Sequence, residues 1–194
     1  MKSFEELLEI SVAAHGHLCS GQIIGVLMSM LGLSLIGVDP EDKDSRKKVI
    51  VFVEIDRCAT DAIQSVTGCR LGKRTMKFKD FGVNAATFVN LETGKAFRIV
   101  STEESRDIAD ALVPEESEPA KRQIIGYQRM KNEDLFAVTQ VTVKLGSSDM
   151  PGPTKAKAVC VQCGQVVRDG REMIKDGKPY CRVCGGDAYF TPLA

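Results

Sequence analysis

Four of the seven cysteines form two Cys-x-x-Cys pairs near the end of the sequence, Cys160–Cys163 and Cys181–Cys184. Two residues between a pair of thiolates allow one tight turn to aim both sulfurs at a single ion. Two such turns supply the closed tetrahedral sulfur shell that zinc prefers in structural sites. The sequence therefore predicts one structural zinc per chain. Because a closed shell leaves no position open for a substrate, we expect this site to have no catalytic role.

The segment between the two pairs carries several cations, which leaves two functions open for the zinc finger. It is either an element for stability and docking, or a finger that binds a protein or a nucleic acid. Glycines follow both pairs, at Gly164 and Gly185, where the chain must turn sharply. The cations that would serve the binding function are Arg168, Arg171, Lys175, Lys178 and Arg182.

Both histidines of the chain fall in one short motif, His15-Gly16-His17-Leu18-Cys19. Residues two apart do not share a helical face, so the motif is expected on a turn or an extended segment. There the alternate side chains of His15, His17 and Cys19 can project to the same side. Since imidazole and thiolate are common zinc ligands, the motif predicts a second metal or thiol site, with simple burial of these side chains as the alternative.

Two more cysteines follow, and they differ in their expected role. Cys58 comes directly after an apolar strand and opens a helix, whose N-terminus can lower the pKa of a thiol. We therefore take His17, Cys19 and Cys58 as catalytic candidates, and His15, His17, Cys19 and Cys58 as metal ligands. Three protein ligands would leave a position open for water or substrate. For Cys69 we expect structural burial.

A glycine- and cation-rich segment, residues 67–74, could cradle an anionic group of a substrate. It lacks the complete pattern of a phosphate-binding loop. The predicted substrate-binding residues are Asp61, Lys73 and Arg74.

The elements that must position these residues alternate between helices and strands, which predicts an α+β fold with a mixed sheet flanked by helices. The expected helices are Phe4–Ala14 (with a capping box at Ser3 and Glu6), Gly21–Leu35, Asp61–Val66, Glu103–Leu112 and Pro119–Lys131. The expected strands are Val49–Ile55, Met76–Phe81, Ala85–Leu91, Ala96–Val100 and Leu135–Leu145, and Pro40–Lys48 is a polar connection. We predict a core domain over 1–146, a linker over 147–157 and a finger of treble-clef or ribbon type over 158–194.

The composition and charge of the chain give only coarse limits on its partners and location. Lys+Arg and Asp+Glu both total 26, so net charge indicates no nucleic-acid partner. Met1–Glu9 is acidic and unlike a secretory signal, and the longest apolar stretch, Ile23–Val38, is short for a membrane span. We expect a cytoplasmic protein with no membrane contact, in which cysteines serve metal or thiol chemistry rather than disulfides.

Four separate motifs resemble the E-subunit family of formylmethanofuran dehydrogenase. They are His15–Gln22, Asp56–Ile63, Thr67–Lys73 and Asp80–Gly82. The resemblance implies a thioredoxin-like core, a homodimer, and a metal site at the His/Cys cluster. It also implies association with molybdenum or tungsten enzymes of one-carbon metabolism in anaerobes. Family members commonly have proline where this chain has Ser20.

Three functions follow as hypotheses. The chain is an accessory or redox component of a formylmethanofuran dehydrogenase-like enzyme, with zinc in the finger and a second metal in the core. Alternatively, it is a metal- or redox-responsive binding module whose finger contacts a protein or nucleic acid. The third hypothesis is a stand-alone metal-dependent enzyme that uses His17, Cys19 and Cys58.

Overall fold

The computed structural model describes residues 2–42, 44 and 47–193. The chain divides into two compact units, Met1–Val143 and Lys144–Ala194, and each is described by itself. The finer division, with a linker over 147–157, stays a prediction. Part of the predicted polar connection Pro40–Lys48, at 43 and 45–46, lies outside the described residues.

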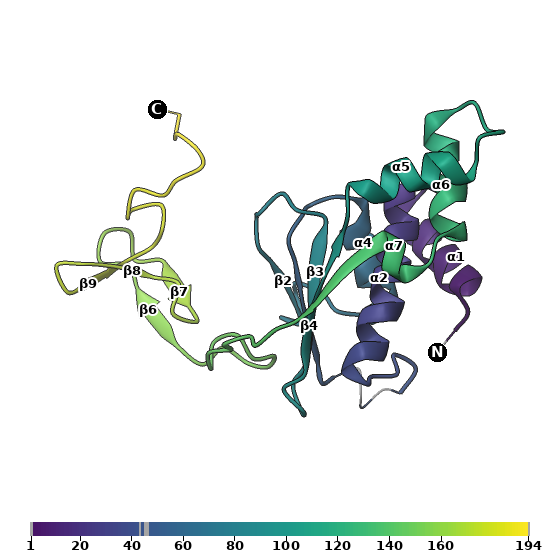
Figure 1. The fold of residues 1–194 in the computed structure, drawn as a ribbon. Coiled ribbons are helices and arrows are strands. Elements are labelled where there is room, and N and C mark those ends of the chain that lie inside the picture. The colour runs from purple at the N-terminus through teal and green to yellow at the C-terminus, as the bar shows by residue number, and fades with distance from the viewer. Residues whose placement is uncertain (1, 43, 45–46, 194) are drawn as a thin grey trace. The chain divides into compact units, whose positions relative to one another are not determined.

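The first unit combines a five-stranded sheet with helices that lie on one side of it (Figure 1). The helices are α1 (Phe4–His15), α2 (Ser20–Ile36), α4 (Cys58–Thr67), α5 (Glu104–Leu112), α6 (Pro119–Arg129) and α7 (Asn132–Leu135). The strands are β1 (Val49–Val53), β2 (Met76–Phe78), β3 (Ala85–Asn90), β4 (Ala96–Ser101) and β5 (Phe136–Gln140). Their order is β2-β1-β3-β4-β5. Because β2 is parallel to β1 and the other pairs are antiparallel, the predicted mixed sheet and α+β class are confirmed.

The boundary between α1 and α2 gives the His-Gly-His-Leu-Cys motif its shape. Helix α1 starts at a complete capping box of Ser3 and Glu6, as predicted. It ends at His15, and Gly16 follows in the left-handed region with φ 99°. Cys19 is the extended N-cap residue of α2, and its side chain makes no capping hydrogen bond. The motif is therefore the short connection between two helices.

Helices α2 and α4 approach each other unusually closely, and glycine makes the approach possible. A Cβ added at Gly25 would lie 2.5 Å from the carbonyl oxygen of Ala59 and 2.6 Å from the Cβ of Ala62. A Cβ at Gly21 would lie 2.8 Å from the Cβ of Cys58. Small residues thus let the N-terminal ends of the two helices lie directly against each other.

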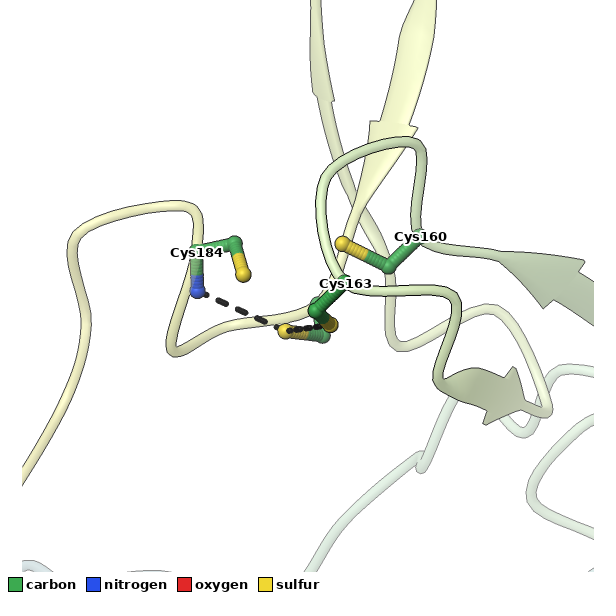
Figure 2. Close-up of side chains that lie close together, drawn as sticks. Cys160, Cys163 and Cys184 are labelled. Carbon is green, nitrogen blue, oxygen red and sulfur yellow. Dashed lines mark hydrogen bonds between the residues drawn. The ribbon is translucent and has the colours of Figure 1, made fainter.

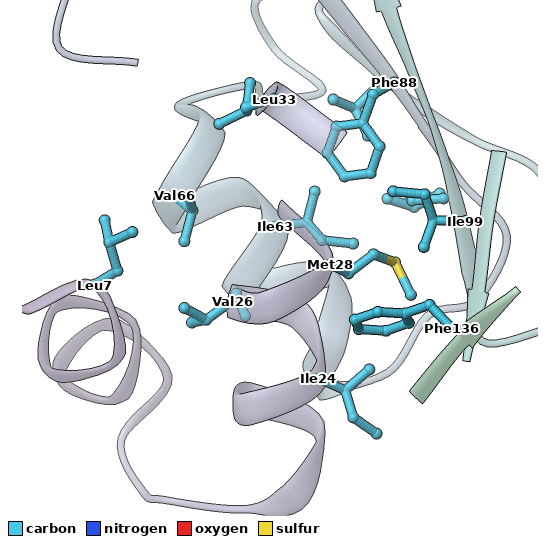
Figure 3. Close-up of a cluster of buried hydrophobic side chains, with 14 of the residues drawn as sticks. Leu7, Ile24, Val26, Met28, Leu33, Ile63, Val66, Phe88, Ile99 and Phe136 are labelled. Carbon is cyan, nitrogen blue, oxygen red and sulfur yellow. The ribbon is translucent and has the colours of Figure 1, made fainter. Parts of the chain in front are cut away.

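The core forms where α2 covers one face of the sheet. Strand register places Val51, Phe88 and Phe97 side by side on this face. Phe88 is fully buried, and its ring occupies the space that a side chain at Gly32 would need. Figure 3 shows Phe88, Met28 and other apolar side chains gathered between helices and strands. This packing holds α2, the helix that Cys19 caps, against the sheet.

Three predicted boundaries are wrong by three residues or more. The last strand ends at Gln140 because its partner β4 begins at Ala96, which accepts the final hydrogen bond, from Val141. Strand β2 ends at Phe78, after which the chain turns back toward the carbonyl of Glu54. Helix α4 begins at Cys58, three residues earlier than expected.

The second unit is built from two antiparallel hairpins. The first pairs β6 (Lys157–Val159) with β7 (Val166–Arg168), and the second pairs β8 (Met173–Lys175) with β9 (Lys178–Tyr180). The described residues of this unit contain no helix, so they follow the ribbon alternative rather than the treble clef. In the described part of the whole chain, no helix is long and apolar enough to cross a membrane.

The Gly25→Ala substitution tests the helix contact. Alanine gains about 1 kcal/mol in helix propensity over glycine. Overpacking a core typically costs about 1–3 kcal/mol, and here the clash is with backbone that cannot move alone. We therefore expect a net loss in the free energy of unfolding, measured by urea denaturation.

Gly72→Ala is the matched control, since nothing lies within 4 Å of a Cβ added there. It should change the free energy of unfolding by less than about 0.5 kcal/mol. Equal stability of the two variants would contradict the close approach of α2 and α4.

Candidate metal and thiol sites

The four cysteines of the second unit converge on one point. Their sulfur atoms all lie within 4.8 Å of one another, and Figure 2 shows the side chains of Cys160, Cys163 and Cys184 turned toward a common centre. The sulfurs of Cys163 and Cys181 are 3.7 Å apart. A tetrahedral zinc with Zn–S bonds of about 2.3 Å requires sulfurs about 3.8 Å apart. The cluster can therefore bind a metal, and the distance between Cys163 and Cys181 is consistent with zinc.

The backbone around the cluster is held by hydrogen bonds. The N–H of Gly164 donates to the carbonyl of Cys160 at 2.9 Å, which closes the first turn. The N–H of Val161 donates to Pro179 at 3.0 Å and ties the two hairpins together. At the second turn the left-handed residue is Gly186. A Cβ at Gly185 would lie 2.5 Å from the sulfur of Met173, whose flexible side chain can shift, and 3.1 Å from the carbonyl oxygen of Cys181.

The pKa values of Cys160 and Cys184 lie far apart. A backbone hydrogen bond from Cys181 is the largest cause that lowers the pKa of Cys160, to about 6. Hydrogen bonds to Cys163 and Cys181 raise the pKa of Cys184 to about 12. Without a cation, one thiolate at this point keeps its neighbours protonated. A divalent metal would remove that conflict by binding all four as thiolates.

In the first unit the structure brings His15, His17 and Cys19 together, as the alternate spacing predicts. One ligand atom of each lies within 4.8 Å of the others. The two imidazole rings are 4.6 Å apart between centroids, tilted by 38°. Two ring nitrogens and a sulfur thus face one small volume at the junction of α1 and α2.

His15 has two ring nitrogens with different surroundings. Nδ1 lies 2.9 Å from Oδ2 of Asp61 on α4. Nε2 is buried and has no hydrogen-bond partner among the described residues. In the neutral imidazole a carboxylate partner favours the tautomer with the proton on Nδ1, and in that tautomer Nε2 carries the lone pair. Metal-binding histidines typically have this arrangement, with the second nitrogen bound to a carboxylate.

Cys58 lies beside this cluster at the first position of α4, half-buried. Burial raises the pKa of its thiol, and the neighbouring thiol of Cys19 raises it further. The prediction that this pKa is lowered is therefore wrong, because burial and the neighbouring thiol of Cys19 outweigh the backbone hydrogen bond that lowers it. Cys58 is a neutral thiol at neutral pH.

A cavity of about 440 Å³ opens beside the histidine and thiol groups. It is lined by His15, Asp56, Arg57, Cys58, Thr60 and Asp61. Of the predicted substrate-binding residues, only Asp61 lines it. Lys73 and Arg74 lie in the turn before β2, which the N–H of Arg74 closes by donating to the carbonyl of Leu71. Their role in binding a substrate stays a prediction.

The remaining thiol, Cys69, is buried, and its sulfur lies 3.8 Å from the carbonyl oxygen of Val49. It contributes to the core, as expected. Sequence reasoning missed Ser11, which is fully buried and donates a hydrogen bond to Gln22. Its only signal was its position four residues before His15, on the same face of α1.

Residues 14–140, more than half of the chain, match the family model described as "FmdE, Molybdenum formylmethanofuran dehydrogenase operon". The chain belongs to the FmdE family. The matched region contains the His15–Cys19 motif, α4 and the whole five-stranded sheet.

Two individual proteins are similar over most of this chain. One is the crystal structure of a tungsten formylmethanofuran dehydrogenase E-subunit (FmdE)-like protein from Syntrophus aciditrophicus. It is 22% identical, with a TM-score of 0.64, and the match covers 98% of this chain and 96% of that one, which shows a shared fold. The other is a probable S-adenosyl-L-methionine-binding protein of Archaeoglobus fulgidus, 29% identical over 90% of this chain. The chain spans about half, 51%, of the length of that relative.

The raised pKa of Cys58 predicts a distinctive alkylation profile. Since only the thiolate reacts, iodoacetamide should modify Cys58 slowly at pH 7, and the rate should still rise above pH 9. Peptide mass spectrometry after short pulses, with the core free of metal, measures the rate. Cys19→Ser should move the profile to lower pH, because Cys19 raises the pKa. A rate that levels off below pH 8 would contradict the assignment.

Proposed function

We propose that this FmdE-family chain is an accessory, metal-binding protein that resembles the E-subunit of formylmethanofuran dehydrogenase and holds a metal in its core. The observation that carries the proposal is His15. Its Nε2 is buried without a partner among the described residues, and its Nδ1 is held by Asp61. One of its two ring nitrogens lies within 4.8 Å of ligand atoms of His17 and Cys19. A buried nitrogen lone pair without a partner is costly unless an ion or a donor satisfies it.

The donor set supports zinc or a related metal. Two imidazole nitrogens and one thiolate are typical ligands of a catalytic zinc, which keeps a fourth position open. The cavity lined by His15 and Cys58 gives small molecules access to that position. A metal bound here supplies a Lewis acid at the cavity wall.

The chain's own residues have separate tasks in this proposal. Asp61 keeps the proton on Nδ1 of His15 and so fixes which nitrogen faces the cluster. Cys58, a neutral thiol on the cavity wall, can donate a proton to a bound ligand or join the metal as a further thiolate. Arg57 places a cation at the cavity, which Asp56 and Asp61 also line.

For the second unit we propose a structural zinc bound by all four cysteines. The sulfur spacing supports this metal, and the closed shell makes the unit a stabilising or docking element. A binding role for the finger is supported by its exposed large apolar side chains. These are Val159, Val161, Val166, Ile174, Val183, Tyr189, Phe190 and Leu193.

The family resemblance supports three further parts of the proposal. The core is thioredoxin-like, with β1 and β2 parallel and β3 and β4 continuing the sheet. The chain forms a homodimer. It associates with a molybdenum or tungsten enzyme of one-carbon metabolism. A location in the cytoplasm is supported separately by the free cysteines, which suit metal or thiol chemistry in a reducing compartment.

Metal content tests the core site. The full chain purified without chelators should contain two metal ions per chain, measured by inductively coupled plasma mass spectrometry. His15→Ala should reduce this to one. Asp61→Asn should retain the second ion with about 10–100-fold weaker affinity, as expected for loss of a carboxylate behind a metal-binding histidine.

Asp80→Asn is a control for lost surface charge, because Asp80 is exposed and does not line the cavity. It should leave both ions in place. A wild-type chain with a single ion, or a His15→Ala variant that keeps two, would refute the core site.

Association tests the accessory role separately. A tagged full chain, purified from its own host at low salt, should bring with it a molybdopterin-containing enzyme. The measurement is molybdenum or tungsten content together with peptide identification. A chain that elutes alone, but with its core metal, would instead favour the stand-alone enzyme.

A further inference from the structure

A chain of hydrogen bonds crosses the three helices below the core site. The hydroxyl of Ser11 on α1 donates to Oε1 of Gln22 on α2. Nε2 of Gln22 donates at 2.7 Å to the carbonyl oxygen of Cys58 on α4. Ser11 and Gln22 are both fully buried, with 0% of their surface exposed. One amide therefore connects all three helices through side-chain hydrogen bonds.

The same three helices supply the groups of the proposed metal site, one helical turn away. Ser11 is four residues before His15 on α1, so the two share a face. Gln22 is three residues after Cys19, the N-cap residue of α2. On α4, Cys58 provides both the carbonyl that Gln22 binds and the thiol beside Cys19. The hydrogen-bond chain therefore lies about one helical turn from the groups of the proposed site.

A purely structural role would not require an amide at this position. Apolar side chains such as Ile23 and Met28 fill the neighbouring interior of α2 without any polar atom. An amide buried here is tolerated only because both of its ends are hydrogen-bonded. Unlike an apolar residue, the amide makes directional hydrogen bonds, and each bond restricts the position of the helix that it reaches.

We propose that Gln22, oriented by Ser11, is a positioning residue that sets Cys58 and Cys19 relative to His15. This inference rests on the proposed core metal site. Gln22 touches neither the cavity nor the group of ligand atoms, and it acts through the position of α4 and the start of α2.

The test uses the full chain with its finger already loaded with one equivalent of Zn²⁺. Gln22→Met keeps the length of the side chain but removes the donor to Cys58. Ser11→Ala removes only the bond that orients the amide. Ile23→Met is the matched control, since it changes a fully buried neighbour on α2 that makes no side-chain hydrogen bond.

Two quantities are measured, the binding of Co²⁺ to the core with its visible spectrum, and the alkylation rate of Cys58 without core metal. Gln22→Met should weaken Co²⁺ binding at least tenfold, alter the thiolate charge-transfer bands and raise the alkylation rate at least threefold. Ser11→Ala should move each quantity in the same direction by less. Ile23→Met should move neither.

The outcomes separate this inference from the proposed function. If Gln22→Met and Ser11→Ala match Ile23→Met in spectrum, affinity and alkylation rate, Gln22 has no positioning role. If the wild-type core binds no Co²⁺ but Gln22→Met still changes the alkylation rate, the metal site fails and the positioning of Cys58 stands. If circular dichroism shows that Gln22→Met does not fold, the comparison of Ser11→Ala with Ile23→Met tests the positioning role instead.

Discussion

The close contact between α2 and α4 is the constraint on which the first unit depends. Gly21 and Gly25 have no side chains to hold the helices apart, and the small residues Ala59 and Ala62 of α4 face them. Because the contact is tightest at the N-terminal ends, it brings Cys19 and Cys58 together, although they are far apart in the sequence. Phe88, which fills the space above Gly32, holds the other end of α2 on the sheet. The geometry of the site therefore follows from which side chains are absent.

The cysteines fall into three environments, and each has different chemistry. In the second unit four sulfurs face only one another, so a metal there would be enclosed and structural. Between α1 and α2, one sulfur lies close to two imidazoles, and one of these, His15, lines a cavity together with Cys58. Cys69 is enclosed by the core and takes part in neither. The surest metal-binding pattern in the chain is thus separate from the place where chemistry can occur.

Local features were predictable from the sequence, and features that depend on distant partners were not. The capping box of Ser3 and the turn at Gly16 follow from neighbouring residues, and the alternate spacing of His15, His17 and Cys19 predicts their convergence. The contact of His15 with Asp61 joins residues 46 positions apart, and no local pattern indicates it. The pKa of Cys58 was predicted in the wrong direction, because helix position can be inferred locally but burial cannot. The end of β5 likewise depends on where β4 begins.

The central claim, that the core holds a metal in addition to the finger, is tested most directly by X-ray absorption at the zinc edge of the zinc-loaded full chain. Two sites predict a mixed first shell, in which sulfur from the four finger cysteines and Cys19 is averaged with nitrogen from His15 and His17. Outer-shell scattering from imidazole rings should accompany the nitrogen. A first shell of sulfur alone, at about 2.3 Å, would contradict the account, since it would place all the zinc in the finger.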